Sequence, residues 1–318
     1  MNTVVEVKNL TKCYGKTTVV DNISFSADSG EILGFLGPNG AGKSTTMNII
    51  TGYISSTSGT VTVDGYDILS NPRKVKSLIG YLPEIPPLYV DMTVRKYLEF
   101  MFDLKRVRLP KKEHIEEVMR LIKIDHVSER LIKHLSKGYR QRVGFAQALL
   151  GNPPVLIFDE PTVGLDPQQI IEIRNIIRSL GKKHTVIFSS HVLSEVSEIC
   201  DRIVVISNGK IVSDTKTENL ASSVSGEQKL SLEVEGSSGT VLDALKVIPH
   251  VKKIRKKADT KDGVSRYVVE YDLDADIRRD VFRALTAKGL VILGMKNADE
   301  TLEDSFLKLV SQDQTKEV

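Results

Sequence analysis

The stretch that decides the fold is Gly37-Pro38-Asn39-Gly40-Ala41-Gly42-Lys43-Ser44-Thr45. An apolar run at 32–36 precedes it and predicts a strand, and Ser44 to Ile50 has the pattern of a helix. A glycine-rich turn that joins a strand to a helix and ends in Lys-Ser matches the phosphate-binding loop, both in its residue pattern and in its position between a strand and a helix. Its backbone N–H groups are expected to surround the β- and γ-phosphates of a nucleotide. Lys43 would bridge these phosphates and Ser44 would ligate Mg²⁺.

A pair of acids, Asp159-Glu160, follows the apolar run Val155 to Phe158. Ligands of open α/β sheets gather at the carboxyl ends of strands, so this position favours a functional site over a solvated turn. Asp159 is expected to hold the metal, directly or through water, and Glu160 to polarise the attacking water. The strand that carries the pair can lie next to the strand that enters the phosphate loop.

Hydrophobic patterning divides the chain into two domains. Over residues 1–220, strands and helices alternate and predict a parallel sheet, and residues 85–150 have the helical spacing of an inserted subdomain. Small polar residues then predict a linker at 221–227. Residues 228–318 follow the order βαββαβ of a ferredoxin-like α+β unit, with a closing helix at Leu302 to Val310.

The composition excludes several classes of protein. The 318 residues include 44 Lys and Arg against 41 Asp and Glu, a balance too even for binding nucleic acid by bulk charge. Cys13 and Cys200 are the only cysteines and offer neither a disulfide framework nor a thiolate metal cluster. Apolar stretches fall far short of the ~20 residues that span a bilayer. Because the N-terminus also lacks the pattern of a secretion signal, we expect a cytoplasmic protein.

A third motif, Leu135-Ser136-Lys137-Gly138-Tyr139, lies before Asp159 at the predicted start of a helix. With the phosphate loop and the acid pair, it resembles the ATP-binding subunits of ABC transporters, whose signature is Leu-Ser-Gly-Gly-Gln. Lys137 and Tyr139 depart from that signature. The resemblance covers about residues 3–220 and is closest to bacterial drug-type and gliding-motility-type exporters. It implies an α/β fold, a P-loop NTPase of ABC type with a mixed β core and a helical subdomain.

The resemblance also implies roles for residues outside the phosphate loop. Ser136 and Gly138 would contact the γ-phosphate bound by a second copy of the chain, because the free N–H groups at the N-terminus of a helix attract anions. Tyr14 falls where an aromatic ring stacks on adenine, although a lone Tyr after a strand is more often a packing residue. Asp166 lies in a loop that resembles the one contacting the opposite subunit, and it is equally suited to capping the helix from Pro167.

Two further positions are carried over in the same way. His191 resembles the switch histidine that hydrogen-bonds the γ-phosphate and helps position the water, although a lone His in a polar loop is usually structural. Glu84 stands where the family usually has a glutamine that contacts metal and water. It keeps an acceptor oxygen but adds a negative charge, and a solvated loop acid is its plainer interpretation.

The function implied is MgATP hydrolysis by a head-to-tail dimer that drives separate integral membrane permease subunits, with export as the direction. The permease would contact residues 84–89 and the helical subdomain, placing the chain on the inner face of the membrane; no nucleic acid is expected. A cassette ATPase acting on ribosomes or DNA is the alternative, although the single phosphate loop and the lack of a long heptad run argue against it. A nucleotide sensor without turnover is disfavoured by Glu160 and His191.

Overall fold

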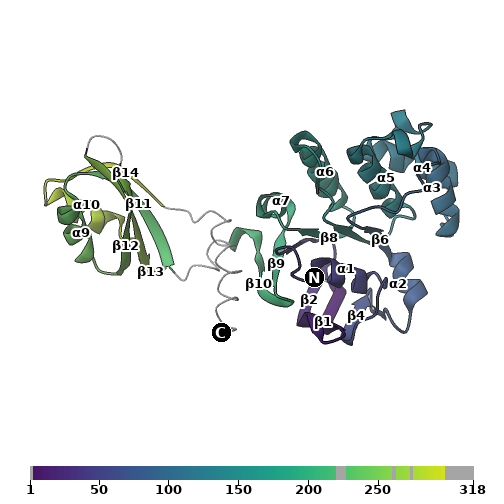
Figure 1. Ribbon diagram of the computed structural model, residues 1–318, viewed down its shortest axis with the longest axis horizontal. Coiled ribbons are helices and arrows are strands. Elements are labelled where there is room, and N and C mark those ends of the chain that lie inside the picture. Colours follow the sequence, from purple (N-terminus) through teal and green to yellow (C-terminus); the bar gives the residue numbers. More distant parts are fainter. Residues whose placement is uncertain (1–2, 220–226, 260–262, 273–274, 298–318) are drawn as a thin grey trace. The chain divides into compact units, whose positions relative to one another are not determined.

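A computed structural model describes residues 3–219, 227–259, 263–272 and 275–297. The chain forms two compact units that divide between Thr217 and Glu218 (Figure 1). Residues 221–226 of the predicted linker and the helix predicted at Leu302 to Val310 lie outside the described residues.

The first unit is built on a six-stranded sheet of order β10-β9-β3-β8-β7-β6. The three central strands β3, β8 and β7 are buried along their whole length, which is why apolar residues run through them without alternation. The strands are β3 (Ile32–Leu36), β6 (Ile79–Leu82), β7 (Val155–Asp159), β8 (Thr185–Ser190), β9 (Arg202–Ser207) and β10 (Lys210–Lys216).

Two expectations about this sheet need correction. β10 pairs antiparallel with β9, so the sheet is not wholly parallel. Asn208 and Gly209 join them with φ of 45° and 78°, the left-handed conformation that a two-residue hairpin requires. The strand of Asp159 is also not next to β3, because β8 pairs with both β3 and β7. β8 therefore brings its own carboxyl end between the two motifs.

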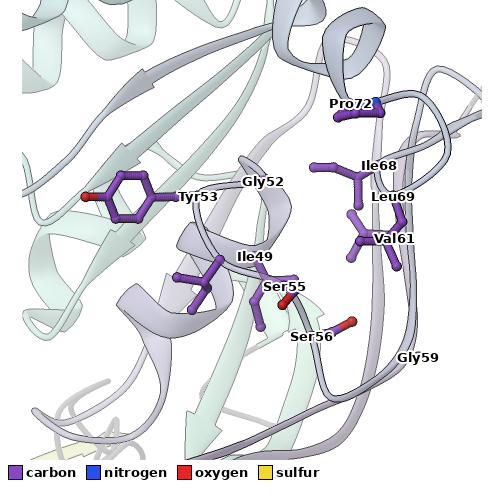
Figure 2. Close-up of a pocket in the computed structure, with 11 residues that line it drawn as sticks. Ile49, Gly52, Tyr53, Ser55, Ser56, Gly59, Val61, Ile68, Leu69 and Pro72 are labelled. Carbon is purple, nitrogen blue, oxygen red and sulfur yellow. The ribbon is translucent and has the colours of Figure 1, made fainter.

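A second sheet of order β2-β1-β4-β5 is antiparallel and shares one hydrophobic core with the first sheet and α1. Its strands are β1 (Thr3–Tyr14), β2 (Thr17–Asp28), β4 (Ser58–Val63) and β5 (Tyr66–Asp67). A cavity of about 180 Å³ lies between this sheet and the end of α1 (Lys43–Ile50). Figure 2 shows Ile49 on one side of it, Val61 and Ile68 on the other, and the ring of Tyr53 directed away.

Helices α3, α4 and α5 gather into one group in Figure 1, within the range predicted for the helical subdomain. Thr93 caps α3 by accepting a hydrogen bond from the Lys96 N–H, and Tyr97 of α3 donates to Gln147 of α5. Among the described residues, no helix is both long and apolar enough to cross a membrane. The helices of this unit beyond α1 are α2 (Pro72–Leu78), α3 (Val94–Leu104), α4 (Lys111–Ile122), α5 (Lys137–Leu149), α6 (Pro167–Leu180) and α7 (Leu193–Ile199), with short 3₁₀ turns at Asp125–Val127 and Ile132–His134. A third 3₁₀ turn, Thr217–Asn219, lies where the chain passes from the first unit to the second.

The second unit has the predicted order βαββαβ, in an antiparallel sheet of order β12-β13-β11-β14. This is the strand order of a ferredoxin-like unit. Figure 1 shows both helices on the same side of the sheet, where buried side chains such as Leu232, Tyr267 and Val281 form a separate core. The elements are β11 (Glu227–Glu235), α9 (Ser238–Lys246), β12 (Val251–Asp259), β13 (Val264–Asp272), α10 (Arg278–Thr286) and β14 (Val291–Asn297).

Candidate active site

The phosphate loop turns sharply between β3 and α1. Gly42 is the N-cap of α1 with φ of 104°, and no side chain caps the helix there. A Cβ atom on Gly42 would lie 2.8 Å from the Val19 carbonyl oxygen, and one on Gly37 would lie 2.3 Å from that of Ile206. Only glycine fits at these two positions. The first turn of α1 consequently offers its N–H groups to an anion.

Lys43 is buried beneath this loop. Its Nζ donates hydrogen bonds to the carbonyl oxygens of Gly37, at 2.8 Å, and Pro38, at 3.1 Å. The same Nζ lies 3.1 Å from Oε1 of Glu160, and both side chains are less than a tenth exposed. A buried carboxylate needs such a partner, because charge removed from water is costly unless it is paired.

Glu160 is held in an unusual backbone conformation at the end of β7. Its φ is 46°, in the left-handed region of backbone conformation that residues other than glycine rarely adopt. The Glu160 N–H donates to Ser189 Oγ at 2.9 Å, and Oε2 lies 2.8 Å from Nδ1 of His191. Since an ionised carboxylate only accepts, Nδ1 of His191 carries the proton and Nε2 is left to contact a ligand.

Asp159 lies beside Glu160 and is fastened by two hydroxyl groups. Ser189 Oγ donates to its Oδ1 at 2.6 Å, and the Ser44 hydroxyl also hydrogen-bonds to this carboxylate. Burial raises the pKa of Asp159, and these two hydrogen bonds oppose the rise. A hydroxyl and a carboxylate in contact are hard oxygen donors of the kind that Mg²⁺ takes from proteins when phosphates and water complete its shell.

A pocket of about 380 Å³ is lined by the phosphate loop, Glu160 and His191, and we call it the phosphate-loop pocket. It brings together residues from five separate parts of the sequence, which only the fold places side by side. Nine of the predicted site residues are among its lining, which is Val19, Asn39, Gly40, Gly42, Lys43, Ser44, Thr45, Glu84, Glu160, Val163 and His191. Glu84 is exposed, and with Ser44 and Asp159 it also lines the neighbouring cavity.

Four predicted site residues that lie outside the phosphate loop and the acid pair do not line this pocket. Tyr14 ends β1 and is half exposed, with Lys12 Nζ 5.0 Å from the centre of its ring. Ser136 caps α5 by accepting from the Tyr139 N–H, and Gly138 packs against Gln169. Asp166 caps α6 through the Gln169 N–H at 2.9 Å. Within one chain, the signature motif and the Asp166 loop therefore lie apart from the phosphate loop.

Two side chains that position the site residues were not predicted from the sequence. Ser189 bridges Asp159 and Glu160, and its only sequence signal is a hydroxyl at the end of an apolar run. Glu195 of α7 is buried and accepts hydrogen bonds from Thr162 Oγ1, at 2.6 Å, and Ser190 Oγ, at 3.0 Å. This carboxylate ties the segment after Glu160 to the segment before His191.

We expect Glu195→Ala to destabilise the chain, because two buried hydroxyl groups lose their acceptor. The cost should be about 1–3 kcal/mol in the free energy of unfolding, measured by urea denaturation. Glu195→Gln keeps one oxygen acceptor and should cost less, and Glu113→Ala, which removes an exposed acid of α4, should cost almost nothing. Equal losses for Ala and Gln at position 195 would show that the hydrogen bonds contribute little.

The mostly parallel sheet and the phosphate-loop pocket at its carboxyl edge define the first unit as a P-loop nucleoside triphosphatase. Residues 20–163 match the family model described as ABC transporter. The chain belongs to the family of ABC transporter ATP-binding proteins, and as a member it binds ATP and is an ATPase.

Relatives match along almost the whole chain. The bacitracin transport ATP-binding protein BcrA of Bacillus licheniformis is 31% identical, with 98% of each chain covered. The linearmycin resistance ATP-binding protein LnrL of Bacillus subtilis is 33% identical, over 97% of this chain and 99% of that protein. These matches include the second unit as well as the first.

Solved structures match the first unit. The ATP-binding cassette MJ0796, in a dimeric post-hydrolysis state bound to ADP and Pi, is 26% identical with a TM-score of 0.62. It covers 67% of this chain and 98% of its own. CbiO1 of Clostridium perfringens, part of the ABC transporter complex cbiONQ, is 27% identical with a TM-score of 0.63, over 70% and 92% of the two chains.

Proposed function

We propose that this chain is the ATP-hydrolysing subunit of an ABC exporter and drives a separate membrane permease by closing as a dimer around ATP. The observation that carries the proposal is the chain of contacts from Lys43 through Glu160 to His191 inside the phosphate-loop pocket. The names of two relatives concern the transport of bacitracin and resistance to linearmycin, which supports antibiotic-type cargo and export as the direction.

Each pocket residue has one role in this proposal. The loop N–H groups and Lys43 bind the β- and γ-phosphates. Glu160 accepts a proton from the attacking water as the general base, and His191 holds the γ-phosphate through Nε2 while its Nδ1–H orients Glu160. Ser44 and Asp159 would hold Mg²⁺, with Glu84 beside them, and the ion would neutralise charge on the phosphates.

The dimer follows from the residues that a single chain keeps away from the pocket. Ser136 and Gly138 begin α5, so their N–H groups and the Ser136 hydroxyl can bind an anion. They do not line the phosphate-loop pocket of their own chain. We infer that a second copy, docked head to tail, supplies them to the γ-phosphate and that Asp166 lies at the same contact. Tyr14, half exposed at the end of β1, is proposed to stack on adenine.

The partner of this dimer is proposed to be an integral permease, which would hold the chain at the inner face of the cell membrane. It would dock near residues 84–89, where Ile85 is 81% exposed and Tyr89 is 56% exposed. Exposed apolar side chains beside a nucleotide site suit a partner that responds to the bound nucleotide.

The test is recovery of the tagged chain from gently solubilised membranes, with the ATPase rate of the recovered complex compared with that of the isolated chain. We expect a multi-spanning protein to co-purify and the rate to rise, and Glu160→Gln to abolish the ATPase without preventing recovery. Recovery of ribosomal or DNA-associated proteins in place of a membrane protein would overturn the transport proposal.

A further inference from the structure

Lys137 adds a positive charge to the signature motif, and the proposed function gives this lysine no role. It is the first residue of α5, directly after the N-cap Ser136. The positive end of the helix dipole lies there, so an acidic side chain is favoured at this position and an ammonium group is disfavoured. The first turn of α5 contains no acid that could compensate. A cation therefore occupies the end of the helix where it is least favourable.

The Lys137 side chain lies across the loop that carries Asp166. A Cβ atom on Gly164 would lie 2.2 Å from Lys137 Nζ and 3.3 Å from its Cε, so a larger residue at position 164 would displace this side chain. Gly164 has φ of 70°, which independently favours glycine. Beside this contact, Gly138 packs against Gln169 of α6. These contacts join the signature motif and the Asp166 loop into one surface of the chain.

The ammonium group of Lys137 has no partner within the part of the chain that the structure describes. The side chain is exposed and takes part in no ion pair or hydrogen bond there. Neighbouring charges are already engaged, since Arg140 donates to the Lys133 carbonyl oxygen at 2.8 Å and Lys133 pairs with Asp91 at 3.0 Å. The carboxylate of Asp166 caps α6. This surface thus offers an anion both a free ammonium group and the N–H groups at the start of α5.

We propose that Lys137 determines the specificity of closure for a triphosphate: its ammonium group contacts the γ-phosphate of ATP in the phosphate-loop pocket of a second copy. This inference rests on the proposed function, which brings Ser136 and Gly138 to that phosphate. It adds a charged donor that the Leu-Ser-Gly-Gly-Gln pattern, with glycine at this position, does not have. Charge-assisted hydrogen bonds are stronger than neutral ones. Because ADP has no γ-phosphate, the contact distinguishes the two nucleotides.

The proposal also accounts for the unfavourable position of the charge. In a separate chain Lys137 opposes the dipole of α5, whereas in the closed dimer a phosphate neutralises it. Lys137 should therefore slightly destabilise the isolated chain and stabilise the ATP-bound dimer. A residue with only a structural role in its own chain would not have these opposite effects, and a loss of stability of this kind is typical of functional positions.

The experiment measures dimer formation by the full chain carrying Glu160→Gln, which we call the parent, by light scattering during a titration with MgATP. Adding Lys137→Ala should raise the ATP concentration at half-maximal dimer formation roughly tenfold, as expected for the loss of a charged donor. The salt dependence of dimer formation should become flatter. Lys137→Arg keeps the charge and should dimerise nearly as the parent does, whereas Lys137→Glu should prevent dimer formation. Lys182→Ala removes an exposed lysine after α6 and is the matched control.

Two further measurements separate a contact with a second copy from a change in folding. Binding of a fluorescent ATP analogue to the dilute chain should be the same with and without Lys137→Ala, because Lys137 does not line the phosphate-loop pocket of its own chain. The urea midpoint of the nucleotide-free variant should equal that of the parent or exceed it, since a charge that opposes the helix dipole has been removed.

Each contrary outcome contradicts a named claim. An unchanged ATP requirement for the dimer of the Lys137→Ala variant would overturn the role of Lys137 and leave the proposed function intact. An equal shift caused by Lys182→Ala would assign the effect to net charge and overturn it as well. Weaker nucleotide binding by the dilute Lys137→Ala chain would place the effect within one chain, which also contradicts the proposal. Absence of an ATP-dependent dimer in the parent would contradict the proposed function itself.

Discussion

Glu160→Gln is expected to lower the steady-state ATPase rate by about 10²- to 10⁴-fold, the range for removing a general base. The amide keeps the size of the side chain and an oxygen that can still accept from His191, but it has no carboxylate to take a proton from water. Affinity for ATP should change little, because Lys43 and the loop N–H groups still contact the phosphates. The measurement is phosphate release at saturating MgATP, with nucleotide binding followed separately.

The same variant should accumulate a dimer in the presence of MgATP. If Ser136 and Gly138 of a second copy contact the γ-phosphate, a nucleotide that is not hydrolysed keeps the two copies closed. Size-exclusion chromatography should then give a dimer with ATP and a monomer with ADP. Glu113→Gln makes the same chemical change at an exposed residue of α4 that does not line the phosphate-loop pocket, so it should behave as the wild type in both assays. Turnover at the wild-type rate by Glu160→Gln would remove Glu160 from its proposed role.

Local patterns predicted the parts of the site that lie next to one another in sequence. The phosphate loop is one such part, since Gly42 must adopt a positive φ and Gly37 must approach another backbone closely. The acid pair is another, because a buried apolar strand ends at Asp159. The βαββαβ order of the second unit was equally predictable, since β11 and β13 place an apolar core residue at every second position.

Long-range pairing could not be predicted in the same way. Nothing in the sequence near Ser189 indicates that β8 lies between β3 and β7, because the order of strands depends on how the whole sheet packs. The partnership of Glu195 with Thr162 also joins residues that are 33 apart. Short strands were missed for a different reason: β5 has only two residues, too few for any hydrophobic period.

The basic run Lys252 to Lys257 shows how a sequence pattern is decided by its surroundings. It lies on β12, an edge strand of the second unit, and its lysine and arginine side chains are exposed. Lys252 pairs with Asp272 at 2.9 Å, and Arg255 pairs with Glu270 at 3.3 Å. The run is therefore a solvated face whose charges are partly paired, and charges of this kind protect an exposed sheet edge from further pairing.

Lys43→Ala is expected to abolish tight ATP binding and turnover, with a loss of about 10²- to 10³-fold in ATPase rate from one charged donor at the phosphates. Its second effect is on stability. Glu160 Oε1 lies 3.1 Å from Lys43 Nζ, and the Glu160 side chain is only 7% exposed. Removing the lysine leaves that carboxylate buried without its cation, which should cost about 3 kcal/mol in the free energy of unfolding.

These two effects can be separated by adding Glu160→Gln to Lys43→Ala. The double variant has no buried charge to neutralise, so urea denaturation should show that most of the lost stability returns. Binding of a fluorescent ATP analogue should not return, because the phosphates still lack Nζ. Lys182→Ala, which removes an exposed cation, should leave both quantities unchanged. If the double variant is as unstable as Lys43→Ala, the ion pair is not what Lys43 contributes to folding, and its contacts with the Gly37 and Pro38 carbonyl groups become the explanation.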